Sequence, residues 1–446
     1  MPHRFPALIA APPAAAGRLW LLNARVFDGT GTNARPGSAV LVEDGMIRHV
    51  CDTGDVPADP GTERRIDLGG RTLLPGLTNA HTHLAGGTID PKPGAEEMLP
   101  NTPTHFLQAA LRDMLRMGVT TLRNTGSQGL QPQEARQAMR YGAFRGPRIL
   151  TCGKIISATA PGGRFYGDMY QEVDGPDGVR NAVRTQVRWG ADFVKVMTTG
   201  ARSNELEDPE PTQFTDGELA AAVDEAHRLG YRVCAHAEGL DGTAAAIAHG
   251  MDTIEHGMFL NQRPELLDQM AENGQFLVPT LTGYYYWAGY SLDVIDPTDA
   301  PTNPEADPML SELGKLNLAE GAKSMRAARE AGVKIALGSD RQGEVMSTSG
   351  ELLRMIHHGL TVREALVAAT KTAAEALGLD DHVGTVEEGK LADLVVVDGD
   401  VLSQPALLAD RDKIWLVLQL GEPVAGAAME QPMTTDADTP ALAGVR

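Results

Sequence analysis

Eight strand-like apolar runs, most of them separated by amphipathic helical stretches, constrain the fold of this 446-residue chain most strongly. They lie at residues 73–83, 120–126, 148–156, 193–197, 232–238, 253–257, 276–281 and 334–340. Strands that alternate with helices along a chain form parallel sheets. Eight such units in about 300 residues predict a TIM barrel, which is an α/β fold. A doubly wound open sheet is the alternative.

Some helix boundaries in this region can be predicted from individual residues. Thr215 and Glu218 have the spacing of a capping box, so a helix is expected to start there and to end before Gly230. A later helix is expected over residues 363–377, ending at Gly378.

Short apolar runs with turn signals flank the barrel segment on both sides. Near the N-terminus, Asp44 and Gly45 separate two such runs, which is a hairpin pattern. Residues 380–430 again contain only short strand-like runs. We therefore expect a small β-sandwich-like domain built from residues 18–74 and 380–430, beside a barrel formed by residues 75–379.

The two termini have compositions typical of disordered chain. Residues 1–17 are rich in Ala and Pro, and residues 431–446 are largely polar, so we expect a disordered leader and a flexible tail. A signal peptide is the alternative for the leader, although Pro6, Pro12 and Pro13 interrupt its apolar character.

The net charge and the cysteines indicate which kinds of partner and which cellular compartment are expected. The formal net charge is −20, with 59 acidic against 39 basic residues, which argues against a nucleic-acid surface. No apolar run reaches the roughly 18 residues of a membrane span. The widely separated Cys51, Cys152 and Cys234 indicate reduced thiols in a cytoplasmic protein, not a disulfide framework.

Two connections are longer than a compact barrel needs. Residues 201–212 follow the fourth expected strand, and residues 283–317 follow the seventh and begin with an aromatic run. Long loops in compact domains are usually lids or disordered inserts. In a barrel, both would lie over the C-terminal face, where active sites are found.

His81 and His83 end the first strand of the expected barrel. Side chains two residues apart on a strand point to the same face, so both imidazoles can converge on one point. Two unrelated surface histidines are the alternative for this pair taken alone.

Four further residues suited to a metal site lie at or inside later strands: Lys195, His236, His256 and Asp340. Each alone has an ordinary explanation as a lysine extending from an apolar strand, a core histidine or a helix cap. Together with the histidine pair, they occupy strands one, four, five, six and eight, whose C-terminal ends meet in a barrel. The complete set therefore predicts a metal site.

The order His-x-His, Lys, His, His, Asp over these strands resembles the amidohydrolase superfamily in its binuclear, carboxylated-lysine form. Residues 193–197, 235–239 and 252–257 are similar to its prolidase-like branch. That branch includes Xaa-Pro and Xaa-Arg dipeptidases and hydrolases of ochratoxin-like amides. The resemblance extends over roughly residues 19–420.

The resemblance implies a site for two divalent metal ions. Zinc is expected, because it accepts imidazole and carboxylate ligands readily. One ion would be bound by His81, His83 and Asp340, and the other by His236 and His256.

The resemblance also implies two catalytic residues, Lys195 and Asp340. Lys195 would react with carbon dioxide to form a carbamate, so that a cation becomes an anion bridging the two metals. A metal-bridged hydroxide would attack the substrate carbonyl. Asp340 would accept its proton and pass it to the leaving amine.

Two arginines are candidates for substrate binding. Arg164 follows two glycines where prolidase-like relatives often carry a histidine that helps to bind the substrate carboxylate, and a guanidinium suits that task. Arg341 directly follows Asp340 and is expected at the same mouth. For both arginines, a solvated or paired side chain is the alternative.

Other candidate substrate contacts are acidic or aromatic. Glu238 stands where many relatives have histidine, which implies a different substrate and favours a basic group on it. One of Tyr284, Tyr285 and Tyr286 is expected to hydrogen-bond the substrate, while the others form an apolar wall.

The resemblance implies a metal-dependent hydrolase that cleaves the amide-type C–N bond of a dipeptide or N-acyl amino acid. The same site suits a lactone, carbamate, urea or organophosphate ester as alternatives. A non-catalytic barrel relative is a remote alternative, because such relatives tend to lose ligands and this chain keeps all six. The expected partner is a small-molecule substrate, without nucleic acid or membrane; family relatives are often homo-oligomers.

Overall fold

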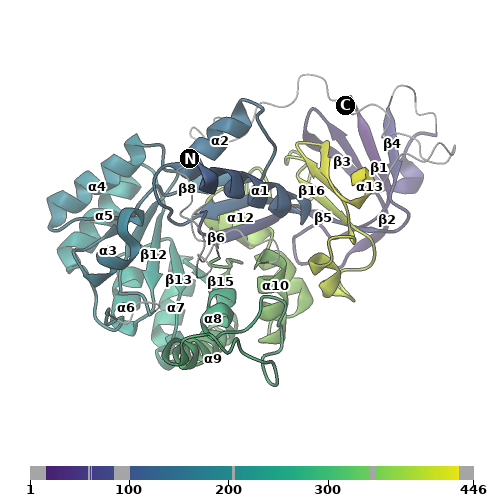
Figure 1. Cartoon of the computed structure of the whole chain (residues 1–446). Helices are drawn as coiled ribbons and strands as arrows, with labels where there is room; N and C mark the ends of the chain where they lie inside the picture. Colours follow the sequence, from purple (N-terminus) through teal and green to yellow (C-terminus); the bar gives the residue numbers. More distant parts are fainter. Residues whose placement is uncertain are drawn as a thin grey trace.

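The computed structural model describes residues 17–58, 61, 63–84, 101–202, 206–341 and 347–430 of the chain. It contains one large mixed sheet and two parallel sheets surrounded by helices (Figure 1). The predicted tail and all but the last residue of the predicted leader lie outside the described residues.

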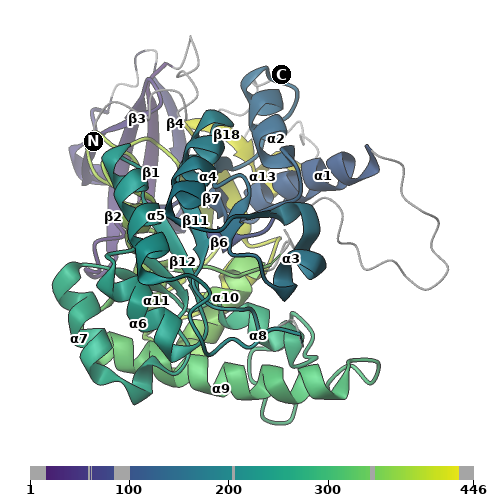
Figure 2. The same cartoon turned by 90° about the vertical axis from the view of Figure 1, so that its left-hand side faces the viewer.

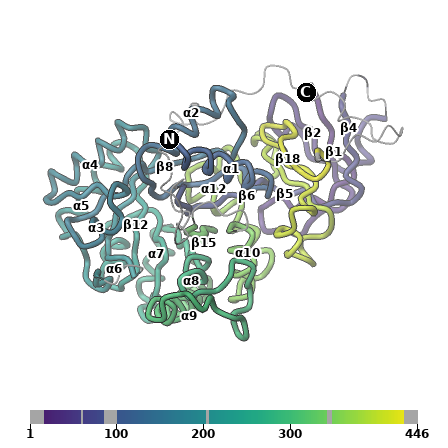
Figure 3. The backbone as a smooth tube through the Cα atoms, viewed as in Figure 1, coloured from purple at the N-terminus to yellow at the C-terminus, as the bar shows by residue number. Residues whose placement is uncertain are grey.

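The mixed sheet joins strands from both ends of the chain. Its order is β18 (Glu422–Ala425), β17 (Ile414–Gln419), β16 (Leu394–Val397), β5 (Thr72–Pro75), β1 (Leu19–Val26), β2 (Arg35–Glu43) and β3 (Met46–Asp52), and β4 (Arg64–Asp67) pairs with β1. Early and late strands lie side by side in Figure 3, in purple and yellow. At the junction, Leu73 of β5 opposes Val396 of β16, and both are fully buried. Apolar burial therefore holds the two ends together.

Two parallel sheets carry the strands between these ends. One contains β6 (Leu77–Thr82), β7 (Val119–Asn124) and β8 (Arg148–Thr151). The other has the order β10 (Tyr170–Glu172), β9 (Ile155–Ser157), β11 (Val194–Met197), β12 (Val233–Ala237), β13 (Thr253–His256), β14 (Phe276–Val278) and β15 (Lys334–Ile335). The strand expected over residues 148–156 is thus divided between the two sheets.

Backbone hydrogen bonds connect the two parallel sheets. Ala80 N donates to Leu337 O at 2.8 Å, and Ser339 N donates to His81 O at 3.0 Å. Beyond the other end of the smaller sheet, Asp192 N donates to Thr151 O at 2.8 Å. The segment after β15 therefore lies beside β6, and the segment before β11 lies beside β8.

Helices flank the parallel strands (Figure 1). They are α1 (Thr102–Arg116), α2 (Gln131–Arg140), α3 (Pro161–Tyr166), α4 (Pro176–Arg188), α5 (Asp216–Arg228), α6 (Leu240–Ala248), α7 (Pro264–Asn273), α8 (Leu281–Trp287), α9 (Pro308–Glu330), α10 (Ser347–His357), α11 (Val362–Ala368) and α12 (Lys371–Leu377), with α13 (Ala427–Glu430) beside the mixed sheet. The predicted capping box starts α5, where Thr215 N donates to Glu218 Oε2 at 2.8 Å. Within the described residues, no helix could cross a membrane.

The prediction of a single helix over residues 363–377 is wrong, because the segment forms two helices, α11 and α12. The carbonyls of Ala368 and Ala369 accept hydrogen bonds from Leu337 N and Thr78 N, at 2.9 and 2.8 Å. These carbonyls bind neighbouring strand segments and not the amides one helical turn later, so the helix is interrupted there.

The long loop expected over residues 283–317 is wrong at both of its ends. Its aromatic run lies in α8, and its last part belongs to the long helix α9, which packs beneath α8 in Figure 2. Ser311 Oγ donates to Ala288 O at 2.8 Å and joins the two helices. The irregular connection between them is therefore confined to residues 288–307.

Candidate metal centre

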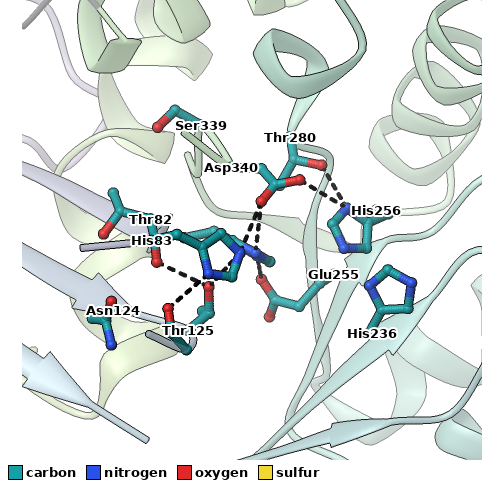
Figure 4. Close-up of polar contacts among 12 residues, drawn as sticks. Thr82, His83, Asn124, Thr125, His236, Glu255, His256, Thr280, Ser339 and Asp340 are labelled. Atoms are coloured by element: carbon teal, nitrogen blue, oxygen red, sulfur yellow. Dashed lines mark hydrogen bonds and ion pairs between the residues drawn. The ribbon is translucent and has the colours of Figure 1, made fainter. Parts of the chain in front are cut away.

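All six residues that the sequence singles out as metal ligands line one cavity. They are His81 on β6, His83 directly after it, Lys195 on β11, His236 on β12, His256 at the end of β13 and Asp340 beyond β15. Figure 4 shows His83, His236, His256 and Asp340 converging from these separate strands. The parallel strands deliver these side chains to the same end of the sheets.

Asp340 lies at the centre of the cluster. Its Oδ1 is 3.0 Å from His83 Nε2 and 3.4 Å from His81 Nε2. The ring of His256 lies 5.2 Å from that of His81 and 4.5 Å from that of His236, centroid to centroid. One ligand atom each from His81, His256 and Asp340 lie within 4.8 Å of one another, which is close enough to share a metal ion. His81, His256 and Asp340 therefore form a candidate metal site.

Three of the histidines have their Nδ1 atoms engaged by the protein. His81 Nδ1 lies 2.5 Å from Glu255 Oε2, His83 Nδ1 lies 2.8 Å from Gly126 O, and His256 Nδ1 lies 2.8 Å from Thr280 Oγ1. Such contacts orient an imidazole and leave its Nε2 available to a metal. The rings are thus set in place by the protein itself.

Glu255 belongs to a buried charge network behind His81. Its Oε1 accepts hydrogen bonds from Arg123 Nη2 at 2.7 Å and from Thr253 Oγ1 at 2.5 Å. Arg123 Nε in turn donates to Ala80 O at 2.5 Å. Burial opposes ionisation, but Arg123 and His81 hold the pKa of Glu255 well below its ordinary value. An ionised Glu255 fixes the His81 ring through a carboxylate–histidine contact typical of metal sites.

The protonation states favoured in the cavity suit metal binding. Burial lowers the pKa of His81. Burial and the neighbouring His236 hold the pKa of His256 well below its ordinary value. Burial opposes ionisation of Asp340, but the imidazoles beside it hold its pKa well below the usual range. Neutral imidazole and ionised carboxylate are the forms that ligate divalent cations.

Lys195 has the least ordinary surroundings of the six residues. Its side chain is 2% exposed, and Nζ has no hydrogen-bond partner among the described residues. An unpaired ammonium is costly to bury, whereas an uncharged or carboxylated amine beside cations is not. The donor set and this unpartnered atom therefore fit a metal centre of the carboxylated-lysine type.

Three residues at the site have left-handed backbone conformations without being glycine. The φ angles are 69° at His256, 50° at Thr280 and 50° at Asp340. Such conformations are uncommon outside glycine, especially for a β-branched residue such as Thr280, and they concentrate at functional sites.

The cavity has a volume of about 400 Å³, and six of the residues that line it beyond the ligand cluster are aromatic. The aromatic wall residues are Phe165, Tyr166, Tyr170, Tyr284, Tyr286 and Trp287. Tyr166 and Tyr170 are stacked, with ring centroids 4.9 Å apart. An aromatic wall of this kind suits an apolar part of a substrate.

Three of the five predicted substrate-binding residues line this cavity: Glu238, Tyr284 and Arg341. Tyr284 donates its hydroxyl hydrogen to Glu238 Oε1 at 3.0 Å. Burial and the Glu238 charge hold the pKa of Tyr284 well above its ordinary value, so this hydroxyl remains protonated. The guanidinium of Arg341 stacks on Tyr286, 3.7 Å from the ring centroid.

The structure does not bring Arg164 and Tyr285 to the cavity wall. Arg164 is exposed at the end of α3. Tyr285 donates to Ile295 O at 2.6 Å, and its ring lies 4.4 Å from the guanidinium carbon of Arg354. Tyr285 therefore faces Arg354 and the segment at Ile295, whereas Tyr284 faces the cavity.

Sequence reasoning missed Arg123, Glu255 and Arg202, the last of which lines the cavity. Arg123 and Glu255 did leave a signal, because charged residues inside apolar barrel strands require buried partners. Arg202 left none, since it lies in a polar connection between β11 and α5.

The comparison that decides the family extends over most of the chain. A family model described as "Amidohydrolase family" matches residues 72–424. This chain belongs to the amidohydrolase family. Ochratoxinase from Aspergillus niger is 26% identical over 435 residues, covering 91% of this chain and 86% of that protein.

Two solved structures are similar to this amidohydrolase along its length. A crystal structure of a Xaa-Pro dipeptidase with bound methionine in the active site has 27% sequence identity and a TM-score of 0.79, covering 92% of this chain and 100% of the other. A prolidase complexed with N-methylphosphonate-L-proline has 29% identity and the same TM-score of 0.79 and coverage of 92% and 100%.

These similarities place the protein in the prolidase- and ochratoxinase-like branch of the superfamily, as its sequence motifs predict. It is accordingly a hydrolase of the amide C–N class, with a TIM-barrel-like α/β fold and an additional domain. The divalent metals that this family uses have a candidate site in His81, His256 and Asp340.

Proposed function

We propose that this amidohydrolase cleaves the amide C–N bond of a dipeptide or N-acyl amino acid at a centre for two divalent metal ions. One observation carries the proposal. Six residues from five strands line a single cavity, and its buried Lys195 amine has no hydrogen-bond partner among the described residues. The similar ochratoxinase and Xaa-Pro dipeptidase support amide substrates by their names.

The proposed ligand set follows the positions of the side chains. His81, His83 and Asp340 would hold one ion, and His236 and His256 the other. Lys195 would join both after its amine attacks carbon dioxide, which forms a carbamate and releases a proton. Zinc suits this mixture of imidazole and carboxylate.

Bound metal would supply Lewis acidity and lower the pKa of water to near neutrality. The chain supplies the proton transfer. Asp340 is central in the cluster, so its carboxylate would take a proton and give it to the nitrogen of the leaving amine. His81 is held by Glu255, which keeps the metal-binding nitrogen directed at the site.

We also propose that the two parallel sheets are parts of one eight-stranded barrel, in which β8 and β9 are two parts of one strand and β10 is an addition paired with β9. The hydrogen bonds Ala80 N to Leu337 O and Asp192 N to Thr151 O support this, because they link the two sheets on opposite edges of the smaller one. A barrel brings the C-terminal ends of all its strands to one face, where the ligands lie.

A substrate screen with the zinc-loaded protein tests the proposed function. The library should contain dipeptides and N-acyl amino acids, including aromatic acyl groups that match the cavity wall. Simple esters, lactones and phosphotriesters are the comparison set. Amide hydrolysis that requires metal is expected; faster turnover of the comparison set than of every amide would refute the proposed bond specificity.

A further inference from the structure

Arg202 is a basic residue in the cavity wall that takes no part in the proposed metal centre. It lies in the connection after β11, the strand that carries Lys195. Its side chain is only 10% exposed. A guanidinium so deeply buried needs compensation from its surroundings.

The surroundings fix the position of Arg202 without saturating its side chain. Its backbone N donates to Glu238 Oε2 at 2.5 Å, and its guanidinium carbon lies 4.9 Å from the ring centroid of Phe259. Nη2 pairs with Glu210, whose side chain is 57% exposed. Nε is buried and has no hydrogen-bond partner among the residues described.

Arg202 and Arg341 are the two arginines in the cavity wall. Glu238 is already engaged by the chain, since its two oxygens accept from Tyr284 Oη and Arg202 N. Arg341 stacks on Tyr286, and Arg164 is exposed and outside the wall. The exposed Glu210 pair is weak in water, so it compensates the buried charge only in part.

We propose that Arg202 binds a carboxylate of the substrate, so that this enzyme prefers anionic amides to uncharged ones. A carboxylate in the cavity would complete the charge compensation that the exposed Glu210 provides only in part. This inference rests on the proposed function, which it deepens by assigning the residue that selects a charged substrate.

Kinetics of paired substrates provide the first test. The metal-loaded wild type, R202M and R202K would each be assayed with a hydrolysed N-acyl amino acid and with its carboxamide. R202M should lose about tenfold or more in kcat/KM for the acid, mainly through KM, because it loses a charge-assisted hydrogen bond. Its activity on the carboxamide should change little, and R202K should lie between.

R263M is the matched control. Arg263 also pairs with an exposed glutamate, Glu265, at 2.6 Å, but it is not among the residues that line the cavity. Its preference for acid over carboxamide should equal that of the wild type. Equal losses by R202M on both substrates would indicate a purely structural role and overturn the inference. The inference would also be overturned if R202M kept the wild-type preference for the acid over the carboxamide.

A binding experiment separates this inference from the proposed function. Phenylbutyrate and the uncharged phenylbutanol have no C–N bond to hydrolyse, and their binding to the metal-loaded protein can be measured by calorimetry. R202M should weaken phenylbutyrate binding about tenfold and leave phenylbutanol unaffected. If no amide is hydrolysed but this difference is found, the proposed function fails and the assignment of Arg202 stands. Equal phenylbutyrate affinities in wild type and R202M would overturn the assignment, whatever the enzyme hydrolyses.

Discussion

At the scale of single residues, the burial of Lys195 is explained by the chemistry proposed for it. A lysine that is 2% exposed and lacks an acceptor for Nζ among the described residues does not stabilise the fold as a cation. Carboxylation would convert it into an anion among imidazoles and metal ions. The burial of Lys195 is then a requirement of the site and not a defect of the core.

Replacing Lys195 by alanine should reduce amide hydrolysis by about two orders of magnitude or more, because the proposed carbamate between the metal ions would be lost. Short carboxylic acids such as acetate or propionate should partly restore the rate by occupying the vacated space. Steady-state assays with and without these acids provide the measurement. Lys334→Ala is the control, since Lys334 is a strand lysine with a 50% exposed side chain. Turnover by K195A at the wild-type rate would exclude the bridging role.

Asp340→Asn should retain most of the metal but lose roughly a hundredfold or more in kcat, because an amide cannot accept and return the proton. Metal analysis should find close to two divalent ions per wild-type chain and a similar content in the variant. A D340N enzyme with normal kcat would rule out the proton transfer. A metal-free wild type with full activity would refute the metal centre itself.

At the scale of elements, the extension of β15 is fitted closely against β6. A Cβ atom on Gly338 would lie 2.6 Å from His81 Cβ and 3.0 Å from His81 N. Gly338 thus permits the close approach that puts Asp340 beside the two histidines. The glycine at this position is a condition for the geometry of the ligand cluster.

Gly338→Ala should lower the free energy of unfolding by about 1–3 kcal/mol through overpacking and should also weaken metal binding, since His81 must move. Urea unfolding and metal titration measure the two effects. Gly178→Ala in α4 is the control, because its nearest neighbour would be Val173 Cβ at 3.8 Å. That control should be neutral or stabilising by up to about 1 kcal/mol. A G338A variant with unchanged stability and metal affinity would contradict the packing argument.

At the scale of the whole molecule, a buried ion pair connects the parallel sheets with the mixed sheet. Arg148 Nη1 of β8 lies 2.9 Å from Asp393 Oδ2, which precedes β16, and the side chains are 6% and 1% exposed. Asp393 Oδ1 also accepts from Leu420 N at 2.9 Å. The two parts of the molecule are therefore joined by charge as well as by apolar packing.

Arg148→Met should destabilise the protein by about 3–5 kcal/mol, because it leaves Asp393 buried without its partner. The double variant with Asp393→Asn should recover part of this loss. Urea unfolding of the single and double variants gives the coupling energy. Arg329→Met, at the more exposed Arg329–Glu364 pair, should cost about 1 kcal/mol or less. If Arg148→Met and Arg329→Met lowered the free energy of unfolding equally, burial of the Arg148–Asp393 pair would not affect its contribution to stability.

Local sequence patterns predicted much of the architecture correctly. The capping box at Thr215 and Glu218 starts α5, because such a cap needs only neighbouring residues. The prediction failed where distant segments intervene. Residues 363–377 have helical character throughout, yet Ala368 and Ala369 bind strand segments that lie far away in sequence.

The sequence by itself determined the strand–helix order and the positions of the six proposed ligands, His81, His83, Lys195, His236, His256 and Asp340. Each of these depends on local spacing and on the end of a strand. The tertiary structure alone decided how Glu255 and Arg123 support His81, which tyrosine faces the cavity, and that Arg202 lines its wall while Arg164 does not. These features depend on contacts between residues far apart in the chain, and local spacing does not predict such contacts.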